Sequence, residues 1–245
     1  MCRMFMISGN FGNDATSIYS SLREVAERDP VLVGSNSSWS SHSDGWGMVS
    51  LERDSIVYRR ELTPIYRSNI PDIPSSGIVL AHARAASPGE PHGAIHSHPY
   101  QHSDSRYTVF LTHNGSLKKD KLAMELGVDY MFDTDSDLFL KYIISMKGDI
   151  QERLQKSIDK AIDKEMFGKL TNIFVIAISN EDFQVDCLYY SYNPTKDEYG
   201  NLYEVYGDGW AGIFSSSIIE AAHFPAKTRN KLCETGIVLK MKCVP

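Results

Sequence analysis

Short apolar runs separated by polar turns predict strands near both ends of this chain and helices in its middle. The runs that predict strands in the first half lie at 2–8, 45–51, 55–62, 77–85 and 107–115. The stretch 77–85 is apolar almost throughout instead of alternating, which is typical of a strand buried on both faces. The stretch 107–115 has the same character and is expected to end in a sharp turn at Asn114-Gly115.

Apolar residues at helical spacing predict one helix ending at the Asp29-Pro30 pair and three more between residues 117 and 167. The last three helices are predicted at 117–126, 135–147 and 150–167. In the final one, Leu154, Ile158 and Ile162 repeat every four residues, so we expect them to form its core-facing stripe.

Strand patterns return in the last third of the chain. The predicted strands there have the sequences NIFVIAIS, VDCLYYSY, LYEVYG, WAGIFSS and GIVLKMKCV. Six tyrosines crowd positions 189–206, and we expect them on half-solvated faces of antiparallel strands. The connections 62–76 and 86–106 are predicted to be loops, and the Gly- and Ser-rich segment 34–45 is predicted to be mobile. Strand clusters enclosing central helices favour a layered α+β domain with helices outside two packed sheets.

Composition places the chain among ordinary globular proteins and narrows its partners. Its 245 residues are 42% hydrophobic and 23% charged, and no linker or repeat divides them, so we expect a single domain over 1–245. The net charge of −6, without any Lys/Arg-rich run, argues against nucleic acid as a partner. Neither a secretory signal nor a run of 18 apolar residues is present, so we expect no membrane association and a cytoplasmic location.

Cysteine and histidine spacing gives no support for a metal or a cofactor. The four cysteines are Cys2, Cys187, Cys233 and Cys243; their wide separation gives no disulfide framework, and we expect the last three to be free thiols. The pair in His96-Ser97-His98 has no carboxylate or cysteine at fitting spacing beside it. We therefore predict no metal site and no cofactor.

Cys2 combines a nucleophile and a base in one residue if Met1 is removed. The thiol needs a base to become a thiolate at neutral pH, and a free α-amine, with a typical pKa of roughly 7.7–8.0, can serve. A chain that keeps Met1 would carry an acylated, inactive Cys2.

Polar residues at the ends of predicted elements supply the other parts of an acyl-transfer site. The Asn114 amide and the Gly115 N–H can stabilise an oxyanion, Arg84 can bind a carboxylate through two donors, and Asp135 can bind an ammonium group. Each has a plainer interpretation. Asn114-Gly115 can be a simple turn, Arg84 a structural ion pair, and Asp135 a helix cap.

Taken in order, these motifs resemble the class II glutamine amidotransferases, which are N-terminal nucleophile hydrolases, and in particular their small stand-alone, YafJ-like branch. The resemblance rests on Cys2, Asp44-Gly45-Trp46-Gly47, His82-Ala83-Arg84-Ala85-Ala86-Ser87, His98-Pro99-Tyr100, His113-Asn114-Gly115 and Thr134-Asp135-Ser136-Asp137. It implies a four-layer αββα sandwich of two packed, mainly antiparallel sheets with helices outside. This chain departs from the family pattern at Ala85, where many relatives have Trp, and at His96, where Asn is usual.

The resemblance also implies roles for individual residues. Cys2 would form a γ-glutamyl thioester with its α-amine as base, and Asn114 and Gly115 would form the oxyanion hole. Arg84, helped by Ser87, would bind the α-carboxylate of glutamine, and Asp135 its α-ammonium. The remaining residues would shape the pocket; they are Asp44, Gly45, Trp46, Gly47 and His98.

The destination of the ammonia stays open at this point. A glutaminase-type domain accounts for about the whole length, without a synthase domain, so ammonia would pass to a separate acceptor subunit or be released by a simple γ-glutamyl amidase. A second hypothesis is a non-catalytic regulatory subunit that binds glutamine or glutamate with the same fold, which retention of Met1 would favour.

Overall fold

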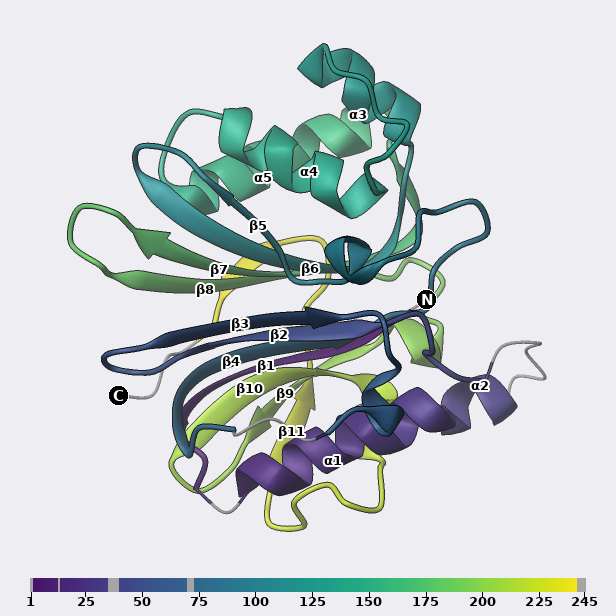
Figure 1. Cartoon of the computed structure of the whole chain (residues 1–245), viewed down its shortest axis with the longest axis vertical. Helices are drawn as coiled ribbons and strands as arrows, with labels where there is room; N and C mark the ends of the chain where they lie inside the picture. Colours follow the sequence, from purple (N-terminus) through teal and green to yellow (C-terminus); the bar gives the residue numbers. More distant parts are fainter. Residues whose placement is uncertain (1, 13, 35–39, 70–72, 242–245) are drawn as a thin grey trace.

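Two antiparallel sheets lie face to face in the computed structural model, and helices cover their outer faces (Figure 1). The structure describes residues 2–12, 14–34, 40–69 and 73–241. The larger sheet runs in the order β11 (Arg229–Leu232), β9 (Leu202–Tyr206), β10 (Trp210–Ser215), β1 (Arg3–Asn10), β4 (Ser76–Ala83), β2 (Trp46–Leu51) and β3 (Ile56–Glu61). The smaller sheet runs β12 (Val238–Lys240), β8 (Val185–Tyr192), β7 (Phe167–Ser179), β6 (Tyr107–Leu117) and β5 (Tyr100–Ser103).

The helices form the two outer layers. The larger sheet is covered by α1 (Asp14–Glu27), with the short helices α2 (Pro30–Gly34) and α6 (Ser216–Ile219) beside it. The smaller sheet is covered by α3 (Lys119–Leu126), α4 (Asp135–Ser145) and α5 (Ile150–Asp163). Three short 3₁₀ turns lie at Ile65–Arg67, Ala94–His96 and Glu198–Gly200. The predicted four-layer αββα architecture is confirmed.

Buried strands explain why the apolar runs do not alternate. In β1, Met4 and Met6 pack between the two sheets, whereas Phe5 and Ile7 pack on the opposite face, against α1. Both faces of the strand are thus covered, and a polar residue on either would lose its hydration. The core has three parts: one under each helical layer and one between the sheets.

The predicted elements differ from the structure in four details. Asn114-Gly115 is not a turn, because β6 continues through it to Leu117, pairing Asn114 with Asn172. In α5 the core stripe passes through Ala161, and Ile162 is 47% exposed. An α-helix advances about 100° per residue, so position 161 lies closer than 162 to the line through Leu154 and Ile158. Finally, the predicted loop 86–106 contains β5, and β11 was missed.

The tyrosine-rich region is also more buried than predicted. Tyr189, Tyr190 and Tyr199 are buried, and only Tyr206 among the six counts as exposed. Tyr190 packs in the core under α5, and Tyr189 packs between the sheets, so β8 is covered on both faces like β1. The predicted mobility of 34–45 falls in part on residues 35–39, which lie outside those the structure describes.

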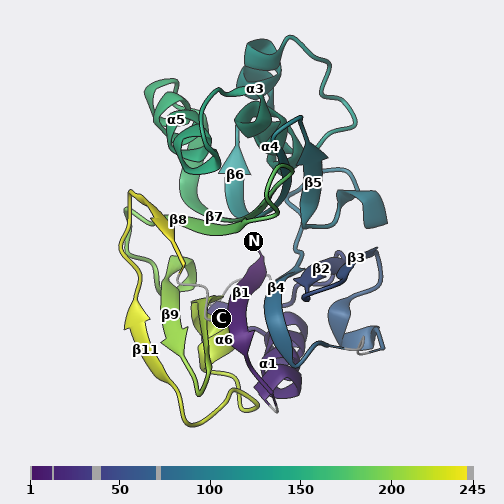
Figure 2. The ribbon, with the colours of Figure 1, turned by 90° about the vertical axis from the view of Figure 1, so that its left-hand side faces the viewer.

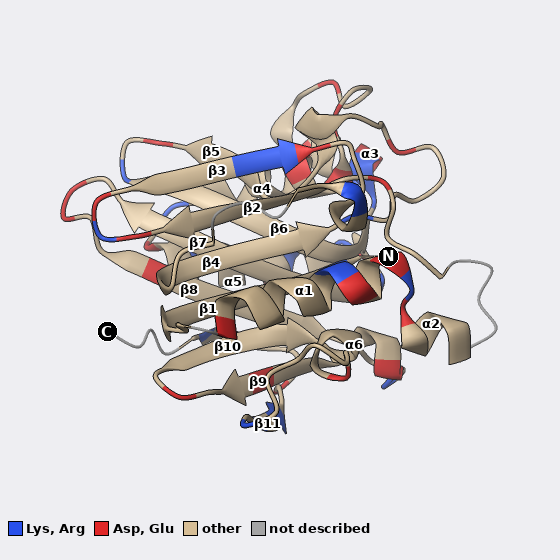
Figure 3. Ribbon diagram, turned by 60° about the horizontal axis from the view of Figure 1, so that its bottom comes forward, with Lys and Arg blue, Asp and Glu red and all other residues tan. Residues whose placement is uncertain are grey.

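Charged residues of both signs are scattered over the sheets and helices in the view of Figure 3. At the end of β3, for example, basic and acidic positions adjoin, and Arg59 forms an ion pair with Glu61 there. Within the described residues, no helix is long and apolar enough to cross a bilayer.

Candidate active site

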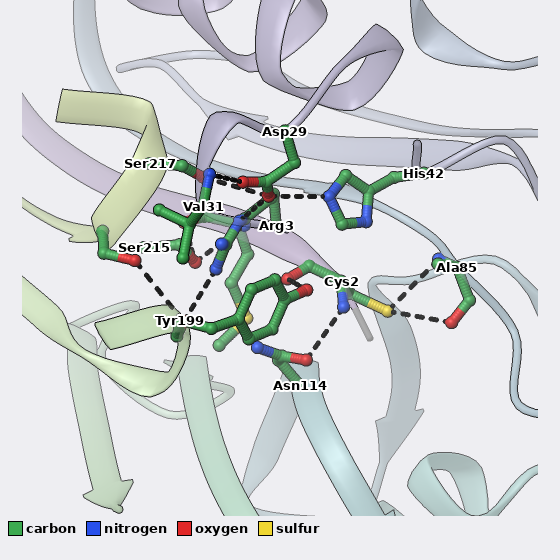
Figure 4. A network of polar contacts seen from close by, with 12 residues as sticks. Cys2, Arg3, Asp29, Val31, His42, Ala85, Asn114, Tyr199, Ser215 and Ser217 are labelled. Atoms are coloured by element: carbon green, nitrogen blue, oxygen red, sulfur yellow. Dashed lines mark hydrogen bonds and ion pairs between the residues drawn. The ribbon is translucent and has the colours of Figure 1, made fainter. Parts of the chain in front are cut away.

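Cys2 directly precedes β1, and the labelled N-terminus lies at the level where the two sheets face each other (Figure 2). It is 7% exposed and is held on three sides (Figure 4). Its backbone N–H donates to Asn114 Oδ1 at 2.8 Å, and its carbonyl accepts from the Tyr199 hydroxyl at 3.1 Å. The thiol donates to the Ala85 carbonyl at 3.6 Å and accepts from the Ala85 N–H at 3.4 Å. These contacts fix both the backbone of the nucleophile and the direction of its sulfur.

A pocket adjoins the thiol and collects most of the predicted site residues. Arg84, Ser87, Gly115 and Asp135 line it together with Cys2, and so does His98. Its volume is about 30 Å³, which holds little more than a water molecule. A ligand with the size of an amino acid therefore requires the pocket to widen.

Arg84 lines this pocket and has a buried donor without a partner among the described residues. The residue directly follows β4 and is 4% exposed. Its Nη2 donates to the Pro91 carbonyl at 3.0 Å, but its buried Nη1 has no hydrogen-bond partner in the described part of the chain. An ion pair to Arg84 is likewise missing among the described residues, which argues against the structural ion-pair interpretation.

Asn114, like Arg84, has a buried side-chain donor without a partner among the described residues. Its side chain is fully buried, Oδ1 accepts the Cys2 N–H, and Nδ2 has no partner within the described residues. The next residue, Gly115, has φ +153, and a Cβ there would lie 2.3 Å from the Leu170 carbonyl oxygen, so only glycine fits. Asn114 thus anchors the nitrogen of Cys2 through Oδ1, while its buried Nδ2 is left without a partner among the described residues.

Asp135 is the first residue of α4, but it is not the cap of this helix. Thr134 is the N-cap, because its Oγ1 accepts the Asp137 N–H at 3.2 Å. The Asp135 carboxylate accepts from the Leu117 N–H at 2.8 Å and from Ser136 Oγ at 3.0 Å. Asp135 therefore links α4 to the end of β6 and contributes negative charge to the pocket. Ser87 is exposed at the rim.

The segment Asp44–Gly47 supports the pocket from behind. Asp44 Oδ2 accepts the Ala86 N–H at 2.8 Å, which holds the chain just after Arg84. A Cβ on Gly47 would lie 2.3 Å from the His98 carbonyl oxygen, so this glycine permits the close approach of that loop. Gly45, with φ +111, has the same role towards Ser97. Trp46 instead packs under α1, against Tyr19.

Three buried histidines lie beside the site. Burial lowers the pKa of His82 and of His98 well below the ordinary value, and it also lowers that of His113. The rings of His82 and His98 lie 4.1 Å apart, and neither nitrogen of His98 has a partner among the described residues. No group of three or more His, Cys, Asp or Glu in the described chain is arranged to hold a metal ion.

A buried ionic network, which was not predicted from the sequence, lies directly behind Cys2 (Figure 4). Arg3 is fully buried, and its Nε donates to the Asp29 carboxylate while its guanidinium lies 3.6 Å from the centre of the Tyr199 ring. His42 donates to the same carboxylate at 3.0 Å. Burial alone would raise the pKa of Asp29, but the His42 hydrogen bond and the Arg3 charge hold it well below its usual range.

The position of Arg3 was the available signal. An arginine inside the apolar run CRMFMIS must either leave the sheet or find a buried partner. The partner, Asp29, precedes a proline, and this pair predicts the end of a helix and not an ion pair. Because Tyr199 also bonds the Cys2 carbonyl, this network fixes the backbone of the nucleophile.

No protein-family model matches the chain, and no curated protein matches it. Among solved structures, it is similar to the allosteric regulatory enzyme of purine biosynthesis, with a TM-score of 0.69 and 14% sequence identity. That match covers 98% of this chain and 46% of the enzyme, so this chain spans less than half of that protein. A predicted glutamine amidotransferase from Pseudomonas aeruginosa PA01 also matches, with 12% identity over 98% of this chain and 96% of that one, at a TM-score of 0.49. The two-sheet sandwich and the first of these likenesses show that the chain shares its four-layer αββα fold with part of that enzyme.

Proposed function

We propose that this chain, as one glutaminase-type unit over 1–245, is a glutamine amidotransferase or amidohydrolase. It would hydrolyse the side-chain amide of glutamine, or of a related γ-glutamyl compound, to release glutamate and ammonia. One observation carries the proposal: two residues at Cys2 have buried donors without partners among the described residues, namely Asn114, which holds the Cys2 nitrogen, through Nδ2, and Arg84, which lines the pocket with Cys2, through Nη1. A buried donor left unsatisfied costs about 1–3 kcal/mol, so both are better explained as donors to a bound molecule.

The proposed chemistry follows from the groups around Cys2. Once Met1 is removed, the α-amine accepts the thiol proton and the thiolate attacks the amide carbon. Asn114 Nδ2 and the Gly115 N–H stabilise the oxyanion, and one such donor is typically worth about 2.7–4 kcal/mol of barrier. Collapse returns the proton to the leaving nitrogen, releases ammonia and leaves a thioester on Cys2. Water then attacks the thioester to give glutamate and the free thiol.

The other residues of the pocket would bind the rest of the substrate. Arg84 would bind the α-carboxylate with the aid of Ser87, and Asp135 would supply negative charge for the α-ammonium. Asp44, Gly45, Gly47 and His98 would hold the pocket in shape. The reaction as drawn needs no cofactor and no metal, because the thiol itself is the nucleophile.

Two parts of the proposal concern features beyond the described residues. Removal of Met1 involves a residue outside them, and the ammonia acceptor would be a separate chain if ammonia is transferred. We place the reaction in the cytoplasm because of the separated cysteines in the sequence.

The test is mass spectrometry of the intact protein before and after treatment with 6-diazo-5-oxo-L-norleucine, together with a glutaminase assay. We expect loss of Met1, one adduct that maps to Cys2, and ammonia release from glutamine that Cys2→Ala abolishes. Undiminished hydrolysis by Cys2→Ala would refute the assignment of the nucleophile. Glutamine binding without turnover or adduct would instead support the regulatory-subunit hypothesis.

A further inference from the structure

Glu90 lines the same pocket as Cys2, Arg84 and Asp135 and is not explained by the proposed chemistry. One of its carboxylate oxygens, Oε1, pairs with Lys119 Nζ at 3.0 Å at the start of α3. The other oxygen, Oε2, is buried and has no partner among the described residues. Among the residues that line the pocket, Glu90 therefore has an unsatisfied acceptor and Arg84 an unsatisfied donor.

The backbone places Glu90 close to the guanidinium of Arg84. The Glu90 N–H donates to the Ser87 carbonyl at 3.1 Å, which closes a turn directly after the Arg84 segment. Arg84 Nη2 donates to the carbonyl of Pro91, the residue after Glu90, at 3.0 Å. The chain thus folds back on Arg84, and Lys119 ties the returning loop to α3.

The free atoms of the two side chains have opposite character. Arg84 Nη1 is a cationic donor, and Glu90 Oε2 is an anionic acceptor, and both lack a partner in the described structure. A molecule that satisfies both carries a carboxylate and an ammonium group close together, as a free α-amino acid does. Asp135 is less available for this role, because each of its two oxygens already accepts a hydrogen bond.

We propose that Glu90 binds the α-ammonium of the substrate and thereby restricts the site to γ-glutamyl compounds with a free α-amino group. This inference rests on the proposed function, which it deepens by defining the substrate class. Compounds acylated on the α-nitrogen would lack the ammonium charge and would leave Glu90 Oε2 buried without a partner.

The test compares Glu90→Gln with the unaltered chain on two substrates. One is glutamine, and the other is glutaramate, which has the same amide and carboxylate but no α-amine. For glutamine, we expect kcat/KM to fall on the order of 10- to 100-fold, mainly through KM, because a charge-assisted hydrogen bond is lost. For glutaramate, kcat/KM should stay unchanged. Glu152→Gln is the matched control, since Glu152 forms an exposed ion pair with Lys156.

Two outcomes would overturn the proposal. The first is an unchanged kcat/KM of Glu90→Gln for glutamine. The second is an equal loss on both substrates, which would indicate a general disturbance of the pocket. Asp135→Asn is measured in parallel, and a substrate-selective loss confined to this variant would assign the ammonium to Asp135 instead.

Failure of the proposed function gives a different result, namely no turnover and no Cys2 adduct in the unaltered chain. In that case, calorimetric titration of the Cys2→Ala and Cys2→Ala/Glu90→Gln proteins with glutamine and glutaramate tests Glu90 without depending on catalysis. If Cys2→Ala/Glu90→Gln binds glutamine on the order of 10- to 100-fold more weakly than Cys2→Ala does, and binds glutaramate equally well, the role of Glu90 is supported. Equal affinities in the two proteins would overturn it.

Discussion

Lowering the pH from 7.5 to 5.5 is expected to destabilise the folded chain through the histidines that it buries in neutral form. Burial holds the pKa of His82 and of His98 well below the ordinary value, and the pKa of His42 and of His113 is lowered for the same reason. In the unfolded chain, these rings protonate near pH 6.5. The unfolded state thus binds more protons, so their contribution is complete above pH 6.5 and is lost as the pH falls below it.

The size of the effect follows from the linkage relation. A histidine with an unfolded pKa of about 6.5 that stays neutral in the folded state loses about 1.4 kcal/mol between pH 7.5 and 5.5. His82 and His98 together therefore remove about 3 kcal/mol, and His42 and His113 add to it. Typical domains have only about 5–15 kcal/mol of stability. The carboxylates with lowered pKa, such as Asp29 and Asp137, lose their contribution at more acidic pH and do not add to this window.

Urea unfolding at pH 7.5, 6.5 and 5.5 measures this change as a loss in the free energy of unfolding. His98→Gln removes one titrating group, so its free energy should fall by about 1.4 kcal/mol less over the same range, whatever its stability at pH 7.5. His92→Gln is the matched control, because it makes the same replacement at an exposed histidine. A free energy of unfolding that is flat between pH 7.5 and 5.5 would refute the reasoning.

Two further substitutions test the site and the network behind it. Arg84→Lys should raise KM for glutamine with a smaller effect on kcat, because an ammonium group cannot reproduce the two parallel donors of a guanidinium; a kcat/KM at the original level in steady-state assays would disprove the carboxylate-binding role. Asp29→Asn leaves the buried Arg3 without its counter-ion and should lower the free energy of unfolding by about 3–5 kcal/mol in urea titrations. A loss under 1 kcal/mol would show that the Arg3 charge is compensated elsewhere.

The sequence alone was sufficient to predict those strands and helices whose hydrophobic pattern depends on neighbouring residues. The strand at β1 and the helix at α4 follow from residues within a few positions of each other, and both were predicted close to their observed bounds. Asn114-Gly115 was wrongly predicted to be a turn because the pair is a common turn signal, whereas pairing with β7 across the sheet keeps it in a strand. The burial of Tyr190 depends on α5, which no pattern within β8 reveals.

For the site as well, some features could be predicted from the sequence and others could not. Arg84 and Asn114 were singled out by their places at the ends of predicted strands, but those places did not reveal the contacts that leave atoms of these residues unsatisfied. The pairing of Arg3 with Asp29 joins residues 26 positions apart, and the Glu90–Lys119 pair joins a loop to a helix start. Such pairs depend on how the sheets and loops come together, so they became visible only in the folded structure.

The unsatisfied atoms also distinguish the two functional hypotheses. A subunit that only binds glutamine or glutamate needs Arg84 Nη1 and Glu90 Oε2, which match a carboxylate and an ammonium group. It has no use for Asn114 Nδ2, which lies on the residue that holds the Cys2 nitrogen and is buried without a partner among the described residues. Leaving this donor unsatisfied costs about 1–3 kcal/mol, a cost that catalysis recovers when an oxyanion forms beside Cys2. The arrangement around Asn114 therefore favours an enzyme over a binding subunit.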